Sequence, residues 1–195
     1  MGPLLSAGRA AAALALLLLP LPLSGCTTTS AVELQPVSVQ VEHRLTGTVR
    51  VEATGSARRA GVGPRSISGA DLTAALEATL VASALCDGVV QDGRADHVLR
   101  VEVQEAWTSE PQLDMAARVT ARWSLFDGSA RVLRWQDVVQ TKGRATTFDA
   151  DMLEDRTRMA LEDAMRKNLT EGFARLGRRA ELATPLAPAA GDSAP

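Results

Sequence analysis

The sequence of 195 residues contains no tyrosine, and only three tryptophans and three phenylalanines. It has two histidines and two cysteines, and neither pair has the HxxxH or CxxC spacing that is typical of a metal site. Basic and acidic residues nearly balance, at a formal net charge of −2, so the basic excess of a nucleic-acid-binding protein is missing. We therefore expect no metal, no cofactor and no nucleic-acid partner.

Residues with catalytic potential are equally scarce. His43 and His97 each lie at the end of a predicted strand, and Asp96 is adjacent to His97, so the two side chains of that pair point to opposite faces of a sheet. The segment from Gly61 to Pro64 is too short for a phosphate-binding loop and does not connect a strong strand to a helix. We predict no catalytic residues and a protein that is not an enzyme, with a hydrolase or transferase of unrecognised site as the alternative.

The sequence also lacks an apolar run long enough to cross a membrane. The run that begins at Ala10 is roughly fifteen residues long, against the ~20 that a spanning helix needs, and Pro20 and Pro22 interrupt it. Arg9 precedes the run and small residues follow it, which is the layout of a secretory signal.

The signal ends in Leu23-Ser24-Gly25-Cys26, which resembles the lipobox of bacterial lipoproteins. The resemblance implies cleavage before Cys26, a diacylglyceryl thioether on its sulfur and an acylated new amino terminus. Each buried methylene contributes ~0.8 kcal/mol, so two or three acyl chains hold a domain firmly on a bilayer. Thr27 follows the cysteine, and by analogy with lipoprotein sorting in two-membrane bacteria the absence of aspartate there favours the outer membrane, facing the periplasm. The alternatives are a helix that stays in the membrane and an ordinary signal with Cys26 paired to Cys86.

If Cys26 carries lipid, Cys86 has no disulfide partner. It lies near the end of a predicted helix, and Asp87 rather than a basic residue follows it. A reactive thiol needs a basic neighbour, so we expect Cys86 to be buried and inert.

Composition divides the chain into four parts. We expect a signal peptide over residues 1–25, a tether over 26–35, a single domain over 36–179 and a disordered tail, rich in alanine, proline and glycine, over 180–195.

Hydrophobic periodicity predicts the elements of the domain, with period two for strands and 3.6 for helices. Strands are expected over 37–41, 48–53, 97–107, 115–125 and 133–139, the first of these being the weakest, and helices over 69–88 and 151–176. Ser68 should cap the first helix and Gly88 end it; Asp151 should pair with Glu154 to cap the second, and Gly177 should end it. The order predicts an α+β fold, a two-layer sandwich with a mainly antiparallel sheet of about four strands and two helices on one face.

The hairpin between the last two strands has a predicted register. A two-residue turn at Asp127-Gly128 would place Arg134 on the core face, whereas a three-residue loop over 126–128 pairs Ala121 with Leu133. We expect the longer loop, which also pairs Val119 with Trp135 and places Gly128 at positive φ in a bulge.

The three tryptophans share the apolar parity of their strands. Trp107, Trp123 and Trp135 are therefore expected in the core, each with one acceptor for its indole N–H. A hydrophobic groove for an acyl chain or a partner peptide is the alternative.

A long loop from Thr54 to Ile67 is the candidate binding surface. It carries Arg58, Arg59 and Arg65, which could contact the phosphate or carboxylate groups of lipid A or of an acidic partner. The alternative is a solvated loop without a partner.

Four segments between Thr48 and Leu176 carry a family resemblance: ALEATLVASAL, ADHVLRVEV, VTARWSLFDG and RTRMALEDAMRKNL. In their apolar spacing they resemble the YajG-type envelope lipoproteins, and the element order is similar to the lipoprotein plug of the lipopolysaccharide translocon and to the amino-terminal domain of the Tol-system periplasmic protein. The resemblance implies a lipid-anchored module that faces the periplasm and acts by contact, with no catalytic residues. We therefore predict a non-enzymatic accessory or assembly factor that binds a partner protein or a glycolipid. An auxiliary component of an envelope transport system and a structural spacer are the alternatives.

Overall fold

The computed structural model describes residues 32–56, 66–110, 113–128 and 131–179. The elements, in chain order, are β1 (Thr48–Thr54), α1 (Gly69–Ser83), β2 (Gly88–Val89), β3 (His97–Thr108), β4 (Met115–Asp127), β5 (Leu133–Ala145) and α2 (Leu153–Arg179). In this part of the chain, neither helix is long and apolar enough to cross a membrane.

The strands form one mixed sheet in the order β2-β1-β3-β4-β5. β4 is antiparallel to both β3 and β5, whereas β1 runs parallel to both β2 and β3. The parallel pairing arises because α1 carries the chain back to the end of the sheet where β1 began, so β3 starts in the same direction. The α+β class is confirmed, and the strand number and the orientation of β1 are corrected.

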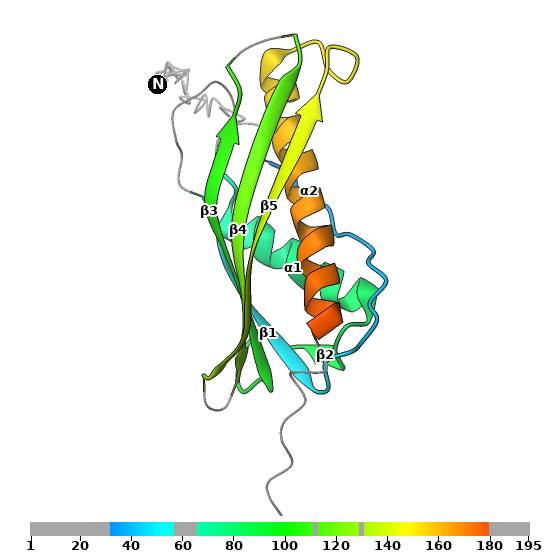
Figure 1. Ribbon diagram of the computed structural model, residues 1–195, viewed down its shortest axis with the longest axis vertical. Helices are drawn as coiled ribbons and strands as arrows, with labels where there is room; N and C mark the ends of the chain where they lie inside the picture. Colours follow the sequence, from blue (N-terminus) through cyan, green and yellow to red (C-terminus); the bar gives the residue numbers. More distant parts are fainter. Residues whose placement is uncertain (1–31, 57–65, 111–112, 129–130, 180–195) are drawn as a thin grey trace, which may run out of the picture.

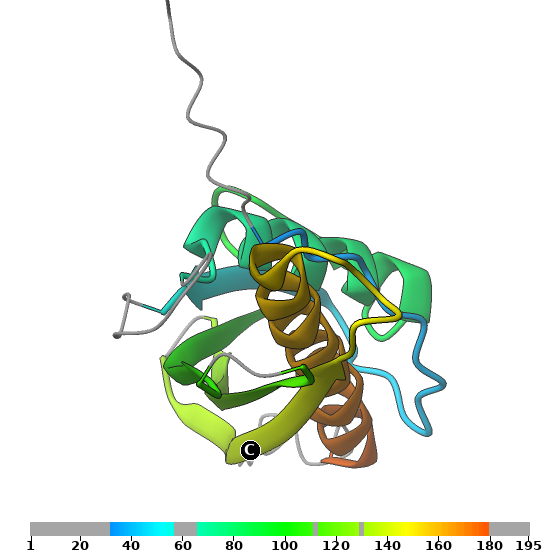
Figure 2. The same cartoon turned by 90° about the horizontal axis from the view of Figure 1, so that it is seen from above.

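The sheet curves around α2, and α1 lies over β1 (Figures 1 and 2). A single hydrophobic core lies between the helices and the sheet, and its largest fully buried side chains include Trp123 and Phe173.

The strand predicted over 37–41 is wrong. Val37 and Val39 are buried as the alternation indicated, but the segment pairs with no strand. It lies against the helices instead, where the Val37 N–H donates to Thr79 Oγ1 at 3.1 Å. Val32, within the predicted tether, is also buried in the core.

The amino terminus of α1 is as predicted, and its carboxyl terminus is not. Ser68 Oγ accepts from the N–H of Asp71 at 3.4 Å, which is the expected cap. The helix ends earlier than predicted, with Ala84 as its C-cap in the left-handed conformation at φ 48°. Gly88 is instead the first residue of β2. Glycine is the usual residue at a left-handed helix end, so the prediction chose the first glycine after the helix; in the structure an alanine takes that position.

α2 begins at Leu153, shortly after Asp151, and passes through Gly177 to Arg179. The prediction that Gly177 ends the helix is wrong. A Cβ at Gly177 would lie 3.1 Å from the Val41 side chain, so this glycine lets the segment before β1 approach the helix closely.

A β-bulge in β3 reverses the expected orientation of Trp107. Val103 pairs with Ala121 but Glu105 pairs with Thr120, so one extra residue lies in β3 between these pairs. Beyond the bulge every side chain changes face, and Trp107 lies on the outer face, 46% exposed. The expectation that Trp107 fills the core is therefore wrong.

The register of the β4–β5 hairpin also differs from the prediction. Ala121 pairs with Val139, and Val119 pairs with Thr141. The turn is longer than three residues, because the N–H of Asp127 donates to the carbonyl of Val132 at 2.9 Å.

A bulge in β5 nevertheless leaves Trp135 on the core side of the sheet, as the prediction required. Leu125 pairs with Trp135 and Phe126 with Leu133, so Arg134 is the extra residue. Trp135 consequently faces the core side, like Leu125. The positive φ of this hairpin is found at Arg131 (52°) rather than at Gly128.

Candidate contact surfaces

The predicted site residues Cys26, Arg58, Arg59 and Arg65 lie outside the described residues. Their roles remain predictions from the sequence.

The residues that flank the arginine-bearing segment, Ser56 and Ile67, are joined by two hydrogen bonds. The Ser56 N–H donates to the carbonyl of Ile67 at 3.1 Å, and the Ile67 N–H donates to Ser56 Oγ at 3.1 Å. Gly55 is required here, since a Cβ would lie 1.8 Å from the Ile67 carbonyl oxygen. Residues 57–65 therefore leave and return to the domain at one point, between the end of β1 and the start of α1.

His97 and Asp96 form structural contacts instead of a catalytic pair. The buried His97 ring has its Nε2 3.0 Å from the carbonyl oxygen of Thr46. The Asp96 carboxylate accepts from the N–H and the hydroxyl of Thr48, at 2.7 and 2.8 Å. These hydrogen bonds, the backbone one first, lower the pKa of Asp96. Both residues fasten the start of β1 to the start of β3.

Cys86 is buried, as predicted, and its burial raises the pKa of the thiol. Among the described residues, no group of three potential ligands could hold a metal ion.

Trp123 joins the helix layer to the sheet through a satisfied polar network. Its indole N–H donates to Asn168 Oδ1 at 3.1 Å, as the prediction of one acceptor requires. Asn168 Nδ2 donates in turn to the carbonyl of Val139 at 2.9 Å. The Phe173 ring meets Trp123 edge-on, with centroids 5.3 Å apart. This arrangement holds α2 against β4 and β5.

A polar cleft of about 330 Å³ lies between the second half of α2 and β5. Its lining residues are Trp135, Asp137, Glu171, Arg175, Arg178 and Arg179. Arg175 donates to Glu171 at 2.7 Å and to Asp137 at 3.0 Å, and both bonds raise its pKa. Arg178 also lies 3.9 Å from Glu171. Two arginines thus pair with two acidic residues, and these ion pairs join the second half of α2 to β5.

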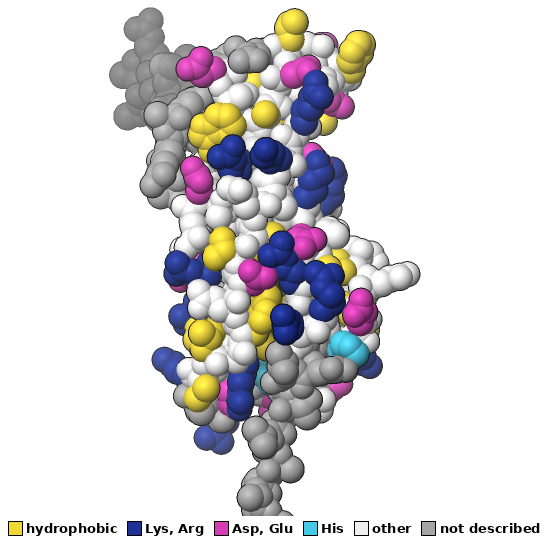
Figure 3. Space-filling model, in the orientation of Figure 1, with side chains coloured by type: hydrophobic (Ala, Val, Ile, Leu, Met, Phe, Trp, Pro, Cys, Tyr) yellow, Lys and Arg dark blue, Asp and Glu magenta, His cyan; other side chains and the backbone are white. Residues whose placement is uncertain are grey.

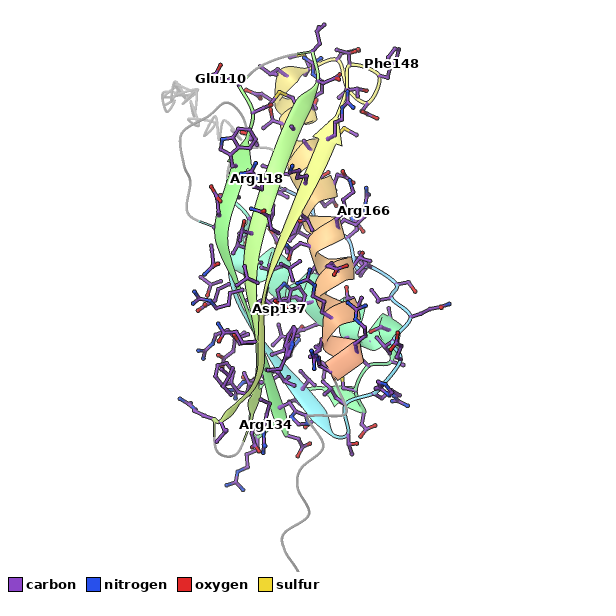
Figure 4. The ribbon with its side chains drawn as sticks, viewed as in Figure 1. Glu110, Arg118, Arg134, Asp137, Phe148 and Arg166 are labelled. Carbon is purple, nitrogen blue, oxygen red and sulfur yellow. The ribbon has the colours of Figure 1, made fainter. Side chains whose placement is uncertain are left out.

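The outer face of the sheet carries charges of both signs among scattered apolar side chains (Figure 3), and several of the charges form ion pairs. Arg100 on β3 donates to Glu52 on the neighbouring β1 at 2.7 Å. This hydrogen bond is the main cause of the lowered pKa of Glu52. Arg118 lies over the Trp107 ring at 5.6 Å and is visible on this face in Figure 4. This face is solvated, as the alternating strand pattern predicts.

Side chains cap the outer edge of β5. The Arg144 N–H donates to Asp163 at 3.2 Å, the Lys142 carbonyl accepts from Lys167 at 3.3 Å, and the Val138 N–H donates to Asp137 at 2.8 Å. Capped edges of this kind resist pairing with another strand, so β5 is a poor surface for strand addition.

An open apolar groove of about 610 Å³ runs along α1 beside β2. It is lined by Ala74, Glu77, Ala78, Val81, Ala82, Val89 and Gln91. Val81 is 69% exposed. The opposite side of α1 is buried on the sheet through Leu72, Leu76 and Leu80, so this helix is apolar on both sides. The small and apolar residues on every side of this helix could have indicated a second contact, because a helix that is apolar all round is normally covered on all sides.

Comparison with known proteins identifies the fold. No family model and no curated protein matches the sequence. Among solved structures, the protein XCC0632 from Xanthomonas campestris, assigned to DUF330, aligns with a TM-score of 0.57 at 14% identity, over 75% of this chain and 94% of that one. The protein CT253 from Chlamydia trachomatis aligns with a TM-score of 0.50 at 12% identity, over 70% and 98% of the two chains. The chain therefore shares its fold with these two proteins.

A minor lipoprotein from Acinetobacter baumannii is a more distant neighbour, with a TM-score of 0.41 at 16% identity over 66% of this chain and 92% of that one. At that level the likeness carries no argument about function.

Proposed function

We propose that this protein is a non-enzymatic lipoprotein of the bacterial envelope that acts by binding a partner protein. The acylated Cys26 anchors it to the outer membrane, and the domain faces the periplasm. The lipobox-like segment before Cys26 supports the anchor, and the second apolar side of α1 supports the binding role.

The groove along α1 is the observation on which the binding role rests. Soluble domains rarely leave contiguous apolar surface open to water, and such surface commonly marks a protein contact. Burial of an exposed valine such as Val81 contributes about 1.5 kcal/mol. The alanines beside it at 74, 78 and 82 keep the groove shallow, so a partner helix can approach α1 closely.

A photo-crosslinking residue at Ala78 in intact cells tests the proposal. We expect it to capture one defined envelope protein, and we expect the added substitution Val81→Asp to abolish the adduct without altering the circular dichroism spectrum. Thr170, exposed on α2, is the control position and should give no adduct. Absence of an adduct at Ala78, or the same adduct at Thr170, would show that the groove is not the binding surface.

The glycolipid alternative rests on Arg58, Arg59 and Arg65. The described residues on either side of these arginines, Ser56 and Ile67, are hydrogen-bonded to each other close to the start of α1. Under this alternative, alanine at all three arginines weakens binding to lipid A phosphates. Unchanged binding, partner recovery and envelope integrity in that variant would eliminate the loop as a site.

A further inference from the structure

One end of the domain exposes large apolar side chains from two separate loops. Leu113, in the β3–β4 connection, is 78% exposed; Phe148 and Met152, between β5 and α2, are 99% and 66% exposed. Figure 1 shows both connections at the same end of the molecule, and Figure 4 shows Phe148 pointing away from it. We call Leu113, Phe148 and Met152 the apolar tip.

The turn that carries Phe148 is well ordered by its own hydrogen bonds. The Asp149 carboxylate accepts from the N–H and the hydroxyl of Thr146, at 2.6 and 2.9 Å, and these bonds lower the pKa of Asp149. The Phe148 N–H donates to Thr146 Oγ1 at 3.2 Å. The phenylalanine is therefore held in the exposed position by the turn.

Arg156 connects the two loops of the tip. Its guanidinium donates to the carbonyl of Leu113 at 3.3 Å, and its backbone N–H donates to the carbonyl of Met152 at 3.1 Å. The Arg156 side chain is itself buried, so the two loops form one surface.

The position of the first described residues relates the tip to the anchor. The Glu33 N–H donates to Glu162 on α2 at 2.9 Å, which fixes the start of the domain beside the first half of this helix. The six Cα-to-Cα steps from Cys26 to Val32 span at most about 20 Å, and the seventh, to Glu33, adds about 3.5 Å.

The length of α2 then decides which end of the domain the anchor can reach. Along the helix axis, the distance from Glu162 to Leu153, at the tip, is about 14 Å, whereas that from Glu162 to Arg179 is about 26 Å. The connection reaches the tip with length to spare, whereas the opposite end lies at the limit of its full extension, so the tip is the end nearer to the anchored bilayer.

We propose that the apolar tip inserts into the interface of the membrane to which Cys26 is anchored, so that the domain stands on the bilayer with α2 directed away from it. The proposal rests on the acylation of Cys26 in the proposed function. Arg144 and Asp114 form an ion pair beside the tip. The acidic residues Asp149 and Asp151 flank the apolar side chains, so the contact is made by apolar insertion and anionic lipid does not strengthen it.

Tryptophan emission in vesicles tests the orientation. The protein carrying Phe148→Trp, extracted from cell membranes, is reconstituted into phosphatidylcholine vesicles with and without brominated acyl chains, and the signal of the parent tryptophans is subtracted. Leu133→Trp is the matched control, because Leu133 is a partly exposed residue of the β4–β5 hairpin at the opposite end. Emission at 148 should shift to shorter wavelength and fall about twofold with brominated lipid, as for an interfacial tryptophan, while emission at 133 stays unchanged.

The outcomes separate the two proposals. Protein that does not float with vesicles lacks the lipid anchor, which overturns the proposed function and the orientation with it. Protein that floats but shows equal emission at 148 and 133 keeps the anchor and overturns the orientation. Leu113→Trp must be quenched together with Phe148→Trp, since quenching at 148 alone would contradict a shared surface.

Discussion

Replacement of Gly172 by alanine tests the contact between α2 and the sheet. A Cβ at this position would lie 2.3 Å from Cε2 and Cζ2 of the Trp123 ring, which is fully buried. The ring cannot move away without breaking its hydrogen bond to Asn168 and its contact with Phe173. Overpacking costs about 1–3 kcal/mol and a broken buried hydrogen bond about 1–3 kcal/mol, offset by about 1 kcal/mol from the better helix propensity of alanine.

The net expectation for Gly172→Ala is a loss of about 3 kcal/mol in the free energy of unfolding. In a domain of this size, that loss lowers the thermal midpoint by about 6–12 °C, measured by far-ultraviolet circular dichroism. Gly177→Ala is the matched control on the same helix, because its Cβ would meet only Val41, at 3.1 Å, in a segment that belongs to no helix or strand. Its midpoint should stay near that of the parent, and equal midpoints for the two variants would refute the packing argument.

Three further outcomes follow from the described contacts. Asn168→Ala leaves the Trp123 N–H and the Val139 carbonyl without their side-chain partner, so chemical denaturation should show a loss of about 2–4 kcal/mol; a loss no larger than that of an exposed substitution would contradict the network. The lowered pKa of Asp96 means that its stabilisation is present above the ordinary value and is lost as the pH falls through the folded-state value, so Asp96→Asn should destabilise at neutral pH and converge with the parent in strong acid; a pH-independent difference would contradict this linkage. Cys86 should react with maleimide only after unfolding, because burial removes access and raises the pKa of the thiol, and rapid labelling of the native protein would show otherwise.

Periodicity was a good guide to the elements and a poor guide to strand pairing. The apolar patterns of β3, β4 and α2 predicted their type and most of their extent, because each element buries one face. The same patterns contain no information about an extra residue in a strand. The bulge next to Val103 therefore reversed Trp107, and the longer turn together with the bulge at Arg134 shifted the β4–β5 register, without any change in composition.

The segment before β1 shows a second limit. Val37 and Val39 alternate with polar residues as in a strand, but the alternation arises from burial against helices. An alternating sequence shows that every second side chain is buried, but it does not show whether a sheet or helices bury it. The parallel pairing of β1 was missed for a related reason. Which strand pairs with β1, and in which direction, depends on the path of the chain through α1, and the alternation within β1 does not record that path.

Of the candidate surfaces, the sequence indicated the loop arginines and the anchor, and it missed the groove and the tip. The outer side of α1 was missed because helical periodicity was applied only to the side of the helix that packs in the core. Phe148 and Leu113 were missed because single apolar residues in loops carry no periodic signal, and only the fold brings them to the same end.

The intact mass of the protein extracted from cell membranes tests the central claim most directly. The account predicts a mature chain that begins at Cys26 and carries a diacylglyceryl group and an amide-linked acyl chain, with Cys26→Ala remaining unprocessed. A mature chain with a free amino terminus and an unmodified Cys26, or one that retains residues 1–25, would contradict it.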